Sequence, residues 1–163
     1  MGKKPVRIIQ AGKMNVEVYS SRVEMGGAAA MKVAEALREV LSRKEEANIL
    51  FSLAVSQLEF FDSLFIQPGI KWDLVNVFVM DEYLGLPEGS EYLLSNFGER
   101  YIFSRAGFKN TFVMNGANPD FEMECKRCAG LLKEHPLDIA CLGIGENGHL
   151  AYNDPGVADF NDP

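Results

Sequence analysis

Residues 74–82 read LVNVFVMDE, a run in which Asn76 is the only polar side chain before the two acids at its end. Apolar residues at nearly every position predict a strand buried on both faces, as in a parallel sheet that is covered by helices. The run stops abruptly at Asp81 and Glu82. Because open α/β sheets bind ligands at the carboxyl ends of their strands, polar chemistry is expected at this point.

Strands and helices are predicted to alternate on both sides of this run. Short apolar stretches at residues 6–9, 49–53, 111–114 and 137–142 predict further strands. Helical spacing of apolar residues fills the gaps, at residues 21–41, from Ser56 onward, at 92–103 and from 118–120 onward. Such alternation predicts an α/β fold with three αβα layers and a mostly parallel, Rossmann-like sheet. The chain shows no repeat or linker, so residues 1–163 are expected to form a single domain.

The composition is that of an ordinary globular protein, with 47% hydrophobic and 24% charged residues. A formal charge of -7 argues against nucleic acid or an anionic membrane as a partner, whereas a small phosphorylated ligand is compatible with it. No apolar run approaches the roughly 20 residues of a membrane span, and the first ten residues lack the apolar region of a signal peptide. The odd count of three cysteines argues against a complete disulfide framework, and a cytoplasmic location is expected.

Cys125 and Cys128 form a C-x-x-C pattern. The pair lies in a helical pattern and has no second pair, whereas a structural zinc site usually needs four ligands. We therefore expect ordinary helix positions, with no metal and no redox role.

The segment 143–156 reads GIGENGHLAYNDPG and follows the last apolar run. Its glycines match G-x-G-x-x-G, which in a dinucleotide-binding fold opens a helix and precedes an acid about 20 residues later. Asn153-Asp154-Pro155 opposes such a helix, and the chain ends before another strand. The segment is therefore better interpreted as a loop that bears a histidine.

His149 is flanked in this loop by Asn147 and Asp154. A carboxylate can fix the tautomer of an imidazole and raise its basicity, so the group suits acid–base catalysis. The alternative is a packed or surface histidine beside a plain Asp-Pro turn.

Two other places are chemical candidates. Asp81, at the lip of an apolar strand, is expected to be partly desolvated, which raises its pKa toward that of a general base; a solvated acidic turn is the alternative. Ser56 and Gln57 stand at a strand-to-helix junction, where free amides favour a phosphate. The simpler interpretation is that Ser56 caps the helix, with Glu59 completing a capping box.

Three segments, FSLAVSQLEFFDSL at 51–64, VFVMDEYLGLP at 77–87 and LGIGENGHLAYNDP at 142–155, together resemble the glucosamine-6-phosphate deaminase/isomerase family, whose wider group includes 6-phosphogluconolactonases. The NDP ending is more similar to the deaminase branch. The resemblance implies conversion of an amino-sugar phosphate to a ketose phosphate and ammonia, without a metal or organic cofactor.

By position, the resemblance implies that Asp81 moves a proton between C2 and C1 and that His149 opens the pyranose ring. Asp154 would orient His149. Asn147 stands where many members have aspartate, so it would contribute hydrogen bonds only. The expected substrate contacts are Ser56, Gln57, Glu82 and Gly145.

The sequence also departs from the family pattern. Leu53, Ala54 and Val55 stand where members usually have glycine, which adds side chains where a phosphate should meet bare backbone. The family's last third, with its basic phosphate contacts, is absent, so the chain is expected to be incomplete relative to the family or to associate with another copy through its uncovered last strand. A non-catalytic sugar-phosphate-binding relative and a lactonase-type hydrolase are the alternative functions.

Overall fold

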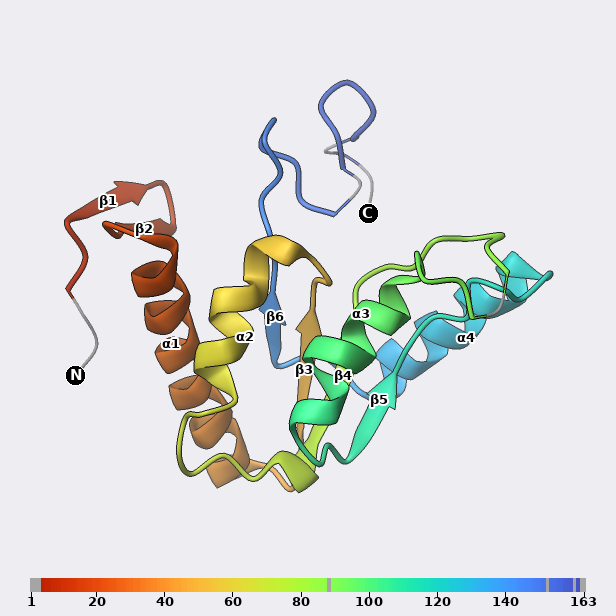
Figure 1. Cartoon of the computed structure of the whole chain (residues 1–163), viewed down its shortest axis with the longest axis horizontal. Helices are drawn as coiled ribbons and strands as arrows, with labels where there is room; N and C mark the ends of the chain where they lie inside the picture. Colours follow the sequence, from red (N-terminus) through yellow and green to blue (C-terminus); the bar gives the residue numbers. More distant parts are fainter. Residues whose placement is uncertain (1–3, 88, 152, 160, 162–163) are drawn as a thin grey trace.

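The computed structural model describes residues 4–87, 89–151, 153–159 and 161. Its centre is a four-stranded parallel sheet in the order β5-β4-β3-β6 (Figure 1). The strands are β3 (Ala47–Phe51), β4 (Val75–Val79), β5 (Asn110–Phe112) and β6 (Ile139–Cys141). The apolar run at 74–82 forms β4, which is buried along its whole length.

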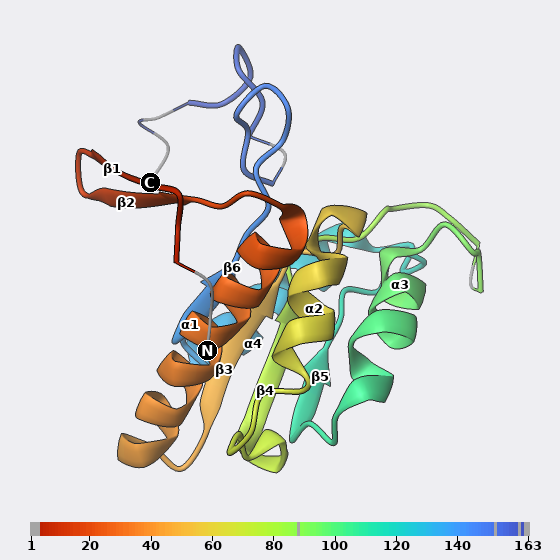
Figure 2. The same ribbon diagram turned by 60° about the vertical axis from the view of Figure 1, so that its left-hand side comes forward.

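Helices cover both faces of the sheet, with α1, α2 and α3 on one face and α4 on the other (Figure 2). The helical segments are α1 (Arg22–Arg43), α2 (Leu58–Leu64), α3 (Leu94–Tyr101) and α4 (Phe121–Glu134), with single 3-10 turns at η1 (Val55–Gln57), η2 (Trp72–Leu74) and η3 (Phe103–Arg105). This arrangement confirms the predicted three-layer α/β fold. Within the described ranges, no helix has the length and apolar character needed to cross a membrane.

Alternate residues of each strand face opposite helical layers. In β3, Ile49 and Phe51 belong to the main core beneath α1 and α2, whereas Leu50 faces α4. The two helices on the main core approach each other closely at Gly26, where a Cβ would lie 2.8 Å from the backbone of Glu59. The core therefore holds α2, and the loop before it, firmly against the end of β3.

The amino-terminal region differs from the prediction. The apolar run at residues 6–9 does form a strand, β1 (Arg7–Ala11), but it pairs with β2 (Met14–Val18) in a separate antiparallel hairpin. Residues 14–18 were not predicted as a strand, although the alternation of Asn15 and Glu17 with apolar residues is typical of a half-exposed one. Glu17 pairs with Lys32 at 2.5 Å, which ties the hairpin to α1.

The predicted cap of α2 is wrong. Ser56 lies inside the 3-10 turn η1, and Gln57 is the residue that precedes α2. Glu59 pairs with Arg22 of α1 at 2.9 Å and does not close a capping box. The ion pair to a neighbouring helix replaces the local interaction that the sequence suggested.

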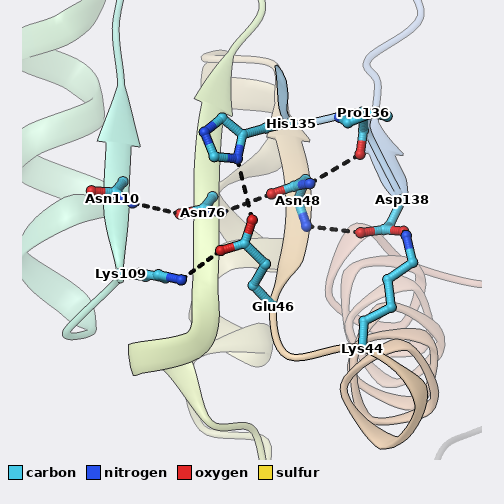
Figure 3. A network of polar contacts seen from close by, with 9 residues as sticks. All are labelled: Lys44, Glu46, Asn48, Asn76, Lys109, Asn110, His135, Pro136 and Asp138. Carbon is cyan, nitrogen blue, oxygen red and sulfur yellow. Dashed lines mark hydrogen bonds and ion pairs between the residues drawn. The ribbon is translucent and has the colours of Figure 1, made fainter. Parts of the chain in front are cut away.

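A chain of amides crosses the sheet near the amino ends of its strands (Figure 3). Asn110 donates to Asn76, and Asn76 donates to Asn48, each at 2.8 Å from nitrogen to oxygen. Asn48 continues the chain by donating to the carbonyl of Pro136 at 3.0 Å. Asn76 is fully buried, and these bonds satisfy its polar atoms. Because the three asparagines are paired in register, the chain fixes the alignment of β3, β4 and β5.

Charged side chains flank this amide chain (Figure 3). Glu46 accepts a hydrogen bond from Lys109 at 2.5 Å and lies 3.2 Å from Nδ1 of His135, the residue directly after α4. Lys109, together with the weaker contact of His135, lowers the pKa of Glu46. The group therefore joins the starts of β3 and β5 to the end of α4.

Candidate active site

A cavity of about 230 Å³ opens at the carboxyl ends of β3, β4 and β6. Its walls come from the loops that follow these strands and from the start of α3. The cavity brings together four of the predicted site residues, which are Ser56, Asp81, Gly145 and His149. These residues are far apart in the sequence, and the parallel sheet places them side by side because the three strands end at one edge.

Asp81 follows β4 after a single residue and lies on the cavity wall. Burial raises the pKa of its carboxyl, and the negative charge of Glu82 raises it further. A carboxylate with a raised pKa is a stronger base than one in water. Asp81 therefore has the position and the basicity that a proton-abstracting group requires.

Glu82 is turned toward the backbone at the start of α3. One of its oxygens accepts from Tyr83 N at 2.8 Å and Leu94 N at 2.7 Å, and the other accepts from Ser95 N at 2.8 Å. The carboxylate satisfies amides that the first turn of a helix leaves unpaired. A direct contact between Glu82 and a substrate stays a prediction.

His149 forms a compact group with Asn147 and Asp154. Its Nδ1 lies 2.6 Å from Oδ1 of Asn147 and 3.1 Å from Oδ1 of Asp154, and Asn147 Nδ2 donates to the same Asp154 oxygen at 2.7 Å. Since both neighbours of Nδ1 are acceptors, we assign the proton of the neutral imidazole to Nδ1. Both predicted flanking residues thus contact the imidazole, and a catalytic role for the three stays a prediction.

Gly145 supports the imidazole ring from below. A Cβ at residue 145 would lie 2.2 Å from Cε1 of His149 and 2.3 Å from its Nε2. The backbone closes the same turn, because Gly145 N donates to the carbonyl of His149 at 2.9 Å. Only glycine leaves room for the ring in this position.

The loop after β3 contains Ser52, which lines the cavity and was not predicted as a site residue. The hydroxyls of Ser52 and Ser56 approach Gly143 from the same side, each 3.9 Å from the place of a Cβ on that glycine. Ser52 stands directly after the last residue of β3, and that position was the sequence signal that could have identified it.

The three residues that replace glycine in this loop differ in where they lie. Leu53 packs in the main core, is 6% exposed and also lines the cavity, whereas Val55 is 66% exposed to solvent. Ala54 lines the cavity as well. Obstruction of a phosphate by the side chains of this loop stays a prediction.

Gln57 is buried beside the cavity. Its amide satisfies both neighbours when Nε2 donates to the carbonyl of Ser52 at 3.0 Å and Oε1 accepts from Gly143 N at 3.1 Å. The opposite orientation leaves one long contact, 3.5 Å from Nε2 to the carbonyl of Cys141, so we assign the first. A contact between Gln57 and a substrate stays a prediction.

The C-x-x-C pair lies on α4, away from the cavity, and Cys125, Cys128 and Cys141 are free thiols. Among the described residues, no three His, Cys, Asp or Glu side chains gather as metal ligands would. Glu124, one turn before Cys128, instead pairs with Arg127 at 2.5 Å and accepts from Asn115 N at 2.8 Å.

Residues 20–152 match the family model described as glucosamine-6-phosphate isomerases/6-phosphogluconolactonase. The chain belongs to this family. Membership confirms the resemblance that the three sequence segments indicated, and it covers β3, β4 and β6 together with the loops that form the cavity.

Relatives within the family include glucosamine-6-phosphate deaminases of Bacillus thuringiensis and Bacillus anthracis, each 35% identical to this chain over 127 residues. The aligned part is 78% of this chain and 48% of the relative. The chain thus spans about half the length of these relatives.

Solved structures share the fold. A monomeric glucosamine-6-phosphate deaminase superposes with a TM-score of 0.72 at 24% identity, over 83% of this chain and 57% of that one. A 6-phosphogluconolactonase from Plasmodium vivax gives 0.78 at 14% identity, over 92% and 54%. At these identities the likeness establishes the fold, and both activities occur on it.

Proposed function

We propose that this chain acts on a hexosamine phosphate, isomerising the open-chain sugar and releasing ammonia. One observation carries the proposal: a half-buried carboxyl, Asp81, and an imidazole held by two acceptors, His149, line the same cavity. The proposed reaction consists of proton transfers followed by hydration, and these are the two groups that such a reaction needs.

Ring opening is assigned to His149. Its Nε2 takes the proton of the hydroxyl on C1 and returns it to the ring oxygen, so that the bond between C1 and the ring oxygen breaks and C1 becomes an aldehyde. Asp154 and Asn147 hold Nδ1 and stabilise the imidazolium between the two transfers. The imidazole leaves this step in its starting form.

Isomerisation is assigned to Asp81. Its carboxylate removes the proton from C2 while the ammonium group on C2 gives a proton to the aldehyde oxygen, which forms an enolamine. Asp81 returns its proton to C1, and a protonated imine is left at C2. Water adds to this carbon, the C–N bond breaks, and ammonia leaves with the ketose phosphate as the second product.

The phosphate is placed beside the loop that follows β3. Ser52 and Ser56 line this side of the cavity, and their hydroxyls are donors of the kind that bind phosphate oxygens. A phosphate bound by these hydroxyls would lie near the start of the loop that bears His149, because both hydroxyls approach Gly143.

A second candidate is a relative that binds a sugar phosphate without turnover, because the chain spans only about half the length of its relatives. A third is lactone hydrolysis, in which His149 would activate water against an ester carbonyl. The 35% identity to deaminases favours the first candidate.

The test measures ammonia release from glucosamine 6-phosphate by the whole chain and by Asp81→Asn and His149→Gln. Loss of either group should lower kcat roughly 10²- to 10⁴-fold. Asp73→Asn is the matched control, because Asp73 lies in η2, before the amino end of β4 and away from the cavity.

Three outcomes separate the candidates. Ammonia release that depends on both residues supports the deaminase. A melting temperature raised by the sugar phosphate, without ammonia release, indicates the binding relative. Acid release from 6-phosphogluconolactone without ammonia release indicates the lactonase.

A further inference from the structure

The loop that bears His149 leaves the sheet at Gly143 and stands above it (Figure 1). Within the described residues, the other hydrogen bonds of 143–159 stay inside that segment, such as Gly145 N to the His149 carbonyl and Gly148 N to the Gly145 carbonyl. The bond between Gly143 N and the Gln57 amide is therefore the polar link between this loop and the α2 side of the site.

The Gln57 amide links the two chain segments that follow β3 and β6. The backbone pairing of β3 with β6 ends where Ser52 N donates to the carbonyl of Cys141 at 3.1 Å. Beyond that point the chains diverge, and the Gln57 side chain spans the gap between the Ser52 carbonyl and Gly143 N. The bridge needs a donor and an acceptor on one side chain, and a primary amide supplies both.

We propose that Gln57 is a positioning residue that fixes the place where the His149 loop leaves the sheet. The inference rests on the proposed function of His149 and goes beyond it, because Gln57 acts on the His149 loop through its bond to Gly143 N. Gln57 is 8% exposed and is the last residue of η1, directly before α2, whose Phe60 and Phe61 lie in the core, so the bridge connects the loop to the packed part of the fold.

Two substitutions of Gln57 separate the two hydrogen bonds of the bridge. Gln57→Met keeps the length of the side chain and removes both hydrogen bonds. Gln57→Glu keeps the acceptor for Gly143 N but places a carboxylate against the carbonyl of Ser52. The hydrogen bond from Gly143 N should therefore be lost in Gln57→Met and kept in Gln57→Glu. Each variant leaves Asp81 and His149 unchanged.

The primary experiment is NMR on the whole chain, because its readout does not depend on turnover. We expect the Gly143 amide to be protected from hydrogen exchange in the unmodified chain, and to exchange about tenfold faster or more in Gln57→Met. The ¹⁵N signals of His149 should report one tautomer in the unmodified chain and a mixed population in the variant. Gln67→Met is the matched control, because Gln67 donates to the Ser63 carbonyl at the far end of α2.

Kinetics provide the second readout. Gln57→Met should lower kcat roughly 10- to 100-fold, as displacement of a catalytic group does, with a much smaller change in KM. An unprotected Gly143 amide in the unmodified chain overturns the inference, and so does a Gln57→Met variant with unchanged His149 signals. If no turnover occurs but Gly143 loses protection in the variant, the bridge stands and the proposed function fails. If Gln57→Met does not fold, hydrogen exchange of the Gly143 amide in the unmodified chain and in Gln57→Glu still tests the bridge.

Discussion

Gly145 lies directly under the ring of His149, so close that a Cβ on residue 145 would overlap Cε1 at 2.2 Å. The imidazole can be a base at Nε2 only while it rests on this bare stretch of backbone and keeps Nδ1 against Asn147 and Asp154. One glycine thus controls the orientation of the proposed ring-opening group.

Gly145→Ala should displace the imidazole and lower kcat about as strongly as His149→Gln, roughly 10²-fold or more. The expected cause is geometric, since the new methyl group and the ring cannot occupy the same space. Ammonia release is the measurement. Gly130→Ala is the control, because a Cβ there meets no atom within 4 Å. Full activity in Gly145→Ala would show that the ring works in another position.

Asp81→Asn should lower kcat and at the same time raise the melting temperature. The pKa of Asp81 is raised by burial, so ionising this carboxyl costs the native state free energy as the pH rises through the folded pKa. The amide removes that cost. The gain in melting temperature should be largest at neutral pH and vanish at a pH below the ordinary range of aspartate. A melting temperature that falls at neutral pH would contradict the burial of this charge.

Glu124→Gln should destabilise the fold at neutral pH by up to roughly 3 kcal/mol, because Arg127 and the Asn115 amide lower the pKa of this carboxyl from 4.5 to about 2. A lowered pKa gives stability above the unfolded value that is lost as the pH falls through the folded value. The difference between variant and unmodified chain should therefore shrink from about pH 5 toward pH 2, as measured by urea unfolding. Glu122→Gln, which changes an exposed carboxyl on the same helix, is the matched control.

Asn76→Leu should cost about 2 kcal/mol of unfolding free energy, because it leaves the Asn48 oxygen and the Asn110 amide without the central member of their chain. Asn110→Ala removes only the exposed end of that chain and should cost less. Urea unfolding of both variants measures which substitution lowers the free energy of unfolding more. Equal costs would mean that the bond from Asn76 to Asn48 adds nothing to stability.

Much of the site followed from one property of the sequence, the position of polar residues at strand ends. Asp81 and His149 could be paired because parallel strands end at one edge, and Asn147 and Asp154 because they lie near His149 in the chain. These predictions needed only the order of strands and loops. The apolar run of 74–82 predicted β4 because a strand that is buried on both faces is apolar at nearly every position.

Other features depend on contacts that no local pattern records. Gln57 pairs with Gly143, which lies in a loop at the end of a different strand, and Glu59 leaves its expected capping role for Arg22 of α1. Each of these outcomes was decided by a partner distant in the sequence.

The amide chain of Asn110, Asn76 and Asn48 lies toward the amino ends of the strands, whereas the cavity lies at their carboxyl ends. The residues that align the strands and the residues that line the cavity thus lie at opposite ends of the strands. Substitutions that alter which sugar is accepted would fall on loops that the alignment of the strands does not depend on. The strand alignment and the cavity can therefore vary independently, because the residues that fix one do not line the other.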